Sequence, residues 1–117
     1  MESTADLSVV PPSQAPSCVV LDLTGELDVA SVPELRQRLT TLILSGRSRL
    51  VLNAARLDFI DAAGIGCLVH AAKLARAEGG WIRLIRLEQR HLRLLRILRL
   101  GRMLPVHESL EDALREE

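Results

Sequence analysis

The stretch RLVLNAARLDFIDAAGIG, residues 49–66, decides the fold. Its beginning, Arg49–Asn53, is short and almost wholly apolar, which predicts a mostly buried strand. Its end, Asp61-Ala-Ala-Gly-Ile-Gly66, opens an alanine-rich helix that is predicted over Ala63–Glu78 and ends at a pair of glycines. A buried strand that leads into a helix is the unit from which mostly parallel sheets are built.

The segments on either side alternate between strand-like and helix-like patterns. Further strands are predicted at Leu7–Val10, Cys18–Thr24, Trp81–Leu87 and Leu104–Val106, and further helices from the Ser31-Val-Pro-Glu34 capping box to Gly46, over Arg90–Leu100, and from Ser109 to about Arg115. The first two strands are joined by a short turn and form a hairpin. The pattern predicts an α/β fold with a four- to five-stranded mixed β-sheet and about four α-helices packed mainly on one face.

The chain has 117 residues and 48% hydrophobic content, which suits one domain with a core of its own. We expect a short polar tail at residues 1–6 and a single domain over residues 7–117. Two cysteines, Cys18 and Cys67, are too few for a disulfide framework or a four-ligand zinc site. No apolar run approaches the roughly 18 residues that span a bilayer. The acidic N-terminus is unlike a secretory signal, so we expect a cytoplasmic protein without membrane insertion.

The formal net charge is zero, but the charges are segregated along the chain. Residues 1–35 hold six acids and no base, residues 36–102 hold fourteen bases and four acids, and residues 103–117 hold five acids and one base. Two interpretations stay open: a basic surface that faces an anion or a partner, or acidic ends that fold over the basic middle. One Trp, one Phe and no Tyr are too few aromatic side chains for stacking bases, so we expect no DNA partner.

Four blocks of sequence occur in an informative order. They are Gly25-Glu-Leu-Asp28 before a Pro-Glu-Leu-Arg helix, Arg49-Leu-Val-Leu-Asn53 before Leu57-Asp-Phe-Ile-Asp61, Asp61-Ala-Ala-Gly-Ile-Gly66, and a tail with Gly101, Leu104-Pro-Val and Ser109-Leu-Glu-Asp. Together, over roughly residues 7–115, they resemble the STAS family and, within it, the bacterial anti-sigma factor antagonists. The resemblance implies a regulatory binding module, not an enzyme, with no catalytic residue, cofactor or metal.

The same resemblance implies the partner and its control. Antagonists of this family bind an anti-sigma factor that is also a GHKL-type kinase, and so free a sigma factor. The kinase switches the antagonist off by phosphorylating a Ser in an Asp-Ser-Ser-Gly loop. By position that Ser falls on Ala62 and the next Ser on Ala63. From Arg49 to Glu108 the chain has no Ser, Thr or Tyr, so we expect an antagonist without the usual phospho-switch.

The resemblance also places the docking surface at the motif loop and the loop over Gly25–Asp28. The implied partner-binding residues are Glu26, Asp28, Asp61, Ala62, Ala63, Gly64 and Ile65. An N-cap role is the alternative for Asp61, and Glu26 and Asp28 are equally well explained as solvated loop acids. We expect a monomer or a weak homodimer. The alternative function is a STAS subunit of another assembly, such as a phospholipid-transport complex or a stress-signalling scaffold.

Two other patterns are compatible with chemistry but favour structural roles. Cys67 and His70 lie one helical turn apart, as a nucleophilic or metal-binding pair would. No third ligand follows at a suitable spacing, so we expect a packed thiol and a surface imidazole, and surface positions for His91 and His107. Gly64 and Gly66 lack the third glycine of a dinucleotide fingerprint.

Arginines recur at every third position of the predicted helix over Arg90–Leu100. With their neighbours they could bind phosphates; the set is Arg83, Arg86, Arg90, Arg93, Arg96, Arg99 and Arg102. The simpler interpretation is a solvated face opposite an apolar face made by Leu94, Leu95, Ile97 and Leu98.

Overall fold

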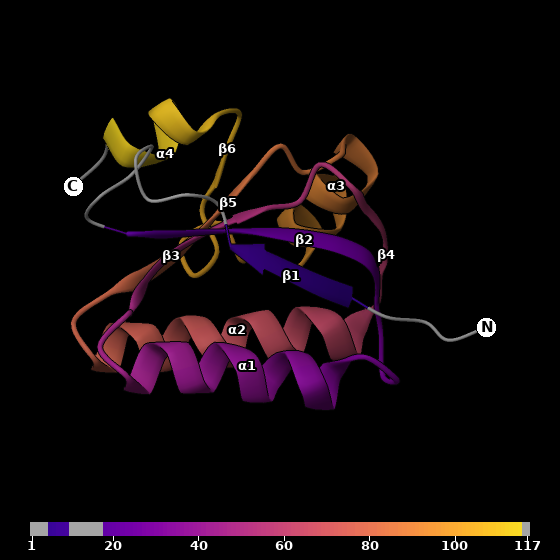
Figure 1. Ribbon diagram of the computed structural model, residues 1–117. Coiled ribbons are helices and arrows are strands. Elements are labelled where there is room, and N and C mark those ends of the chain that lie inside the picture. The colour runs from indigo at the N-terminus through magenta and orange to yellow at the C-terminus, as the bar shows by residue number, and fades with distance from the viewer. Residues whose placement is uncertain (1–4, 10–17, 116–117) are drawn as a thin grey trace.

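The computed structural model describes residues 5–9 and 18–115, and these residues form one sheet with helices on both sides. The elements are β1 (Ala5–Val9), β2 (Val19–Leu27), α1 (Val32–Leu44), β3 (Arg49–Asn53), β4 (Leu57–Ile60), α2 (Ala62–Ala77), β5 (Trp81–Ile85), α3 (Gln89–Ile97), β6 (Val106–His107) and α4 (Leu110–Arg115). The predicted α/β class is confirmed. Figure 1 shows α1 and α2 side by side below the sheet and α4 above it. The predicted tail lies largely outside the described residues.

The sheet is mixed, as predicted. Its strands follow the order β1-β2-β3-β5-β6, while β4 pairs with the end of β2 that extends beyond β3. β1 runs antiparallel to β2, and the remaining pairs of described strands are parallel. Parallel strands are covered on both faces, which explains the nearly continuous apolar sequences of β3 and β5.

The core has two parts, one on each face of the sheet. The larger part packs α1, α2 and α3 against one face, and its fully buried side chains include Leu21, Leu23, Leu39, Leu50, Leu52 and Leu68. In the smaller part, Val20, Val51 and Ile85 meet Ala113 of α4. Successive side chains of a strand point to opposite faces, so each strand serves both parts. Three of the four described helices thus share one face.

β4 is an additional short strand, which the sequence alternation does not reveal. Gly25 pairs with Leu57 and Glu26 with Phe59, so Asp58 is an extra residue without a partner in β2. Such a bulge shifts the alternation by one position. Leu57 and Ile60 can therefore both face the core, where they are 2% and 8% exposed.

α3 ends three residues earlier than predicted. Arg99 adopts a positive φ of 58° just after the helix, and the N–H of Leu100 donates to the carbonyl oxygen of Leu95 at 3.0 Å. This hydrogen bond closes a Schellman motif, so the chain has turned before it reaches the predicted terminator, Gly101. Ile97 and Leu98 consequently stand 69% and 48% exposed. Of the predicted apolar face, only Leu94 and Leu95 pack on the core.

Gly64 lets α2 begin directly against the end of β2. A Cβ at this position would overlap the carbonyl oxygen of Leu27 and lie 2.6 Å from the Cγ of that leucine. A Cβ at Gly66, two residues further along the same helix, would meet nothing within 4 Å. The two glycines of the motif therefore have different structural requirements.

We predict opposite effects for alanine at these two positions. Gly64→Ala should lower the free energy of unfolding by about 1–3 kcal/mol, because the added methyl group forces the helix away from the strand. Gly66→Ala should raise it by up to about 1 kcal/mol, because alanine favours the helix. Urea denaturation of the three proteins measures both changes. Equal effects of the two substitutions would contradict the close approach at Gly64.

Candidate functional site

The carboxyl ends of β2 and β4 bring the two predicted docking segments together. The strands are parallel, with Leu27 opposite Ile60, and the N–H of Asp61 donates to the carbonyl oxygen of Leu27 at 3.2 Å. The chain leaves both strands at the same edge of the sheet, which places residues 26–31 beside residues 61–63. We call the exposed part of these two segments, together with Asp58 and Phe59, the docking face.

Asp61 caps α2, as its alternative interpretation predicts. Its Oδ1 accepts a hydrogen bond from the N–H of Gly64 at 2.9 Å. A cap of this kind stabilises a helix by about 1 kcal/mol. In the described part of the chain no acceptor faces the N–H groups of Ala62 and Ala63. The first turn of α2 therefore offers two backbone donors and the positive end of the helix dipole.

The predicted capping box at Ser31 is wrong, and Asp28 instead closes the turn that precedes α1. Ser31 already has helical backbone angles, and its side chain makes no capping bond. The Oδ1 atom of Asp28 accepts from the N–H groups of Ala30 and Ser31 at 3.0 and 3.2 Å. The Ser31 hydroxyl donates instead to the carbonyl oxygen of Glu26 at 2.9 Å. Asp28 thus shapes the turn that presents the first segment.

The proposed contact residues differ in exposure. Glu26 and Ala62 are exposed, while Asp28, Asp61 and Ala63 are half-buried. Gly64 and Ile65 lie in the core and offer no side chain to a partner. The prediction that Glu26 lies in a loop is wrong: Gly25 takes a φ of 89°, β2 continues past it, and Glu26 pairs with Phe59.

Two apolar residues of the docking face were not predicted from the sequence. Val29 is 73% exposed at the tip of the turn after β2, and Phe59 is 46% exposed on β4. Phe59 lies directly opposite Glu26 in the sheet register. The available signal was Phe59 itself, the one phenylalanine of the chain, which directly follows Asp58. Exposed apolar side chains beside backbone donors are typical of protein–protein contacts.

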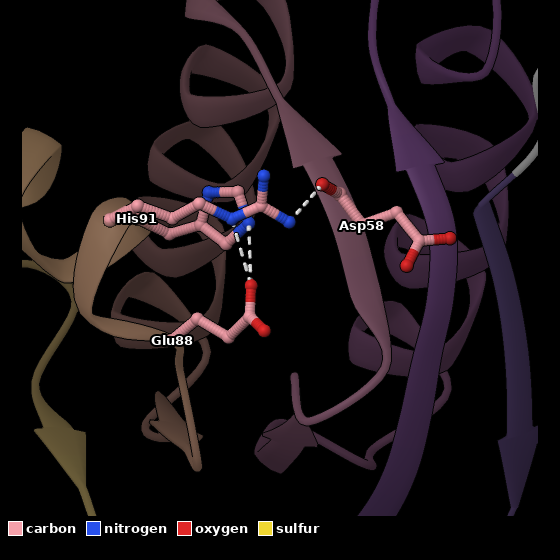
Figure 2. A network of polar contacts seen from close by, with 4 residues as sticks. Asp58, Glu88 and His91 are labelled. Atoms are coloured by element: carbon pink, nitrogen blue, oxygen red, sulfur yellow. Dashed lines mark hydrogen bonds and ion pairs between the residues drawn. The ribbon is translucent and has the colours of Figure 1, made fainter.

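A polar network fixes α3 beside the docking face (Figure 2). The bulge turns the carbonyl oxygen of Asp58 out of the strand ladder, and Nη2 of Arg90 donates to it at 2.7 Å. Nε of Arg90 also donates to Oε1 of Glu88 at 2.8 Å. The same carboxylate oxygen lies 3.8 Å from Nε2 of His91. His91 is 6% exposed, so its predicted surface position is wrong.

The other candidate chemistries find little support in the geometry. Cys67 is 1% exposed, and burial raises the pKa of its thiol, opposed by the nearby Arg36. His70 lies exposed on the outside of α2, so the packed thiol and surface imidazole are confirmed. Among the described residues no three His, Cys, Asp or Glu side chains form a group able to hold a metal ion. None of the described helices is long and apolar enough to cross a membrane.

Arg83 does not belong to the basic surface that the sequence indicated. It is 9% exposed, and its guanidinium carbon lies 3.8 Å from the centroid of the Trp81 ring. Its Nη1 donates to the carbonyl oxygen of Ala113 at 2.6 Å. Arg83 therefore holds α4 on the sheet, which explains why this charge is buried and paired.

Known proteins resemble this chain over most of its length. The family model described as "Mlab, STAS domain" matches residues 11–105. The anti-sigma-B factor antagonist of Bacillus subtilis is 32% identical over 79 residues, which cover 68% of this chain and 72% of that protein. The anti-sigma-F factor antagonist RsfA of Mycobacterium tuberculosis is 29% identical over 100 residues, covering 84% of this chain and 78% of that protein.

The fold also matches a solved antagonist structure. Unphosphorylated SpoIIAA, an anti-sigma factor antagonist from Bacillus, superposes with a TM-score of 0.74 at 25% identity, covering 94% of this chain and 92% of that one. The family model, the sequence relatives and this solved structure thus agree. The chain is a STAS-domain protein and belongs to the anti-sigma factor antagonist family.

Proposed function

We propose that this protein is an anti-sigma factor antagonist that binds its anti-sigma factor through the docking face and so frees a sigma factor. The observation that carries the proposal is the exposed start of α2, where Ala62 follows the capping residue Asp61 in a chain whose relatives are antagonists. A sigma-factor pathway operates in the cytoplasm, so the proposal includes a cytoplasmic location.

The shape and chemistry of the docking face support a protein partner. Ala62 is small and uncharged, so a partner backbone can approach the two free N–H groups at the start of α2. Val29 and Phe59 supply apolar contact area on either side, and such area is the main source of binding free energy at protein interfaces. Glu26 adds an exposed carboxylate that favours a basic group on the partner.

We further propose that the usual phospho-switch is absent. SpoIIAA has been solved in unphosphorylated and phosphorylated forms, so that antagonist can carry a phosphate. In this chain the matching loop residue is Ala62, and no hydroxyl occurs between Ser48 and Ser109. A phosphate would add nearly two negative charges to the docking face. Without an acceptor hydroxyl, a Ser, Thr or Tyr phosphate cannot form on the loop.

The proposal assigns no catalytic role. Cys67 is the nucleophile that an enzyme would need, but it is buried and its pKa is raised by that burial. The thiolate is the reactive form of cysteine. The proposed activity is therefore binding alone, with no cofactor. Membership of another STAS assembly is the alternative, and the binding experiments below separate the two.

One prediction of the proposed function concerns phosphate transfer. The wild-type chain, incubated with its anti-sigma kinase and ATP, should give unmodified peptides throughout residues 49–108, as mass spectrometry of the digest would show. Ala62→Ser restores a hydroxyl at the start of α2 and should gain one phosphate at that position. Ala77→Ser, an exposed position at the other end of the helix, should gain none. Phosphate on the wild-type loop would refute the proposed loss of the switch.

The second prediction concerns affinity. Ala62→Glu should weaken binding to the anti-sigma factor at least tenfold, because the interface would desolvate an unpaired carboxylate at a cost of several kcal/mol. Folding should survive, because a negative charge at a helix N-terminus is stabilising by a few tenths to about 1 kcal/mol. Titration calorimetry measures the affinity and thermal melting checks the fold.

Ala77→Glu is the matched control for this experiment. It makes the same substitution at an exposed alanine of the same helix, at the end opposite the docking face. We expect its affinity to equal that of the wild type. If folded Ala62→Glu also binds like the wild type, the start of α2 is not the interface, and membership of another assembly becomes the better explanation.

A further inference from the structure

The end of α3 carries a second exposed surface of opposite charge, which we call the basic end. It consists of four exposed arginines around two exposed apolar side chains: Arg93, Arg96, Arg99, Arg102, Ile97 and Leu98. Within residues 5–9 and 18–115 none of these guanidinium groups forms an ion pair. Such a surface exposes apolar area to water and concentrates like charge, so it is suited to an acidic partner.

The acidic C-terminal helix does not neutralise the basic end. Glu111 and Asp112 of α4 lie 3.8 and 3.5 Å from Arg115 of the same helix. α4 itself sits on the opposite face of the sheet from α1 and α2 (Figure 1). The interpretation in which acidic ends cover the basic middle therefore finds no support in this helix.

Four of the exposed apolar residues lie on the two charged surfaces, and the fifth, Leu44, lies at the end of α1. Of the five large apolar side chains exposed in the described residues, Val29 and Phe59 lie on the docking face and Ile97 and Leu98 on the basic end. The docking face carries exposed carboxylates at Glu26 and Asp58. The two surfaces are thus complementary in charge, and each has apolar area to bury.

We propose that the basic end of one copy docks on the docking face of a second copy of this chain. Both complementary surfaces occur on every copy, and the formal net charge of zero leaves no overall repulsion between copies. A phosphate backbone offers no apolar surface for Ile97 and Leu98. A bilayer would gain too little from two apolar side chains, because the larger apolar side of α3 is already buried in the core.

The position of α3 allows a closed pair. The helix begins beside β4, where Nη2 of Arg90 meets the carbonyl oxygen of Asp58 at 2.7 Å. Its nine residues span only about 13 Å at 1.5 Å per residue, so the basic end adjoins the docking face. Two copies related by a twofold axis can therefore make the same contact twice, which would end the assembly at a dimer.

Self-association of this kind would regulate the proposed binding to an anti-sigma factor. Only this regulatory role, and not the dimer itself, rests on the proposed function. The docking face holds Ala62, so a dimer covers the surface that the anti-sigma factor needs. Dimer and complex then compete by mass action. A chain without a hydroxyl on its motif loop would in this way remain controllable, through its own concentration.

Light scattering of the whole chain without any partner tests the proposal. We expect a dimer that dissociates on dilution and as salt rises, because screening weakens exposed charge pairs.

Arg93→Glu with Arg96→Glu should weaken dimerisation at least tenfold, and Glu26→Arg with Asp58→Arg should do the same. Mixing these two variants should restore dimers, because each supplies the surface that the other lacks. Arg47→Glu with Lys73→Glu, at exposed bases elsewhere, is the matched control and should dimerise normally.

Ile97→Ser with Leu98→Ser is the variant to use if a charge reversal fails to fold, and it should also weaken the dimer. A chain that is monomeric at low salt and high concentration would overturn the proposal. A dimer that survives both charge reversals, or a mixture that stays monomeric, would overturn it as well. So would a monomer that binds phosphatidylglycerol vesicles or duplex DNA through the basic end. None of these readouts contains the anti-sigma factor, so failure here leaves the proposed function standing.

Discussion

The contact between the end of β2 and the first turn of α2 is the constraint on which the rest of the structure depends. The N–H of Asp61 donates to the carbonyl oxygen of Leu27, and the missing Cβ of Gly64 lets the helix lie against that same residue. The helix therefore begins at the edge of the sheet and not beyond a long loop. Ala62 is exposed there with unpaired backbone donors, beside the turn that Asp28 shapes. A glycine required by close packing thus creates the surface proposed for docking.

The bulge in β4 extends this arrangement to the third helix. The bulge lets the side chains of Leu57 and Ile60 both face the core, and it leaves the carbonyl oxygen of Asp58 without a partner in β2. This exposed oxygen accepts a hydrogen bond from Nη2 of Arg90 at 2.7 Å. The arginine thereby ties the start of α3 to β4. Together with the burial of His91 and Leu95 of the same helix, this contact keeps the basic end next to the docking face.

The sequence pattern predicted the structure correctly where interactions between residues close in the chain decide it. The bounds of β3 and the cap at Asp61 follow from an apolar run and from a short acid before a helix. Ser31 fulfils a capping pattern too, yet its hydroxyl bonds the carbonyl of Glu26, a choice set by tertiary contact. The bulge hid β4 because it breaks strict alternation. Ala62 was identified by family resemblance. The exposure of Val29 and Phe59 and the burial of His91 depend on which elements pack together, and the periodicity of the sequence does not indicate that.

Amide hydrogen exchange of the chain, alone and with its anti-sigma factor, tests the central claim most directly. The N–H groups of Ala62 and Ala63 have no acceptor in the described part of the free chain, so they should exchange fast at a dilution that keeps the chain monomeric. Binding should slow them markedly, together with the amides of residues 28–30, because a partner would cover both segments of the docking face. Unchanged exchange at residues 61–63, with slowing confined to the outer sides of α1 or α4, would contradict the account.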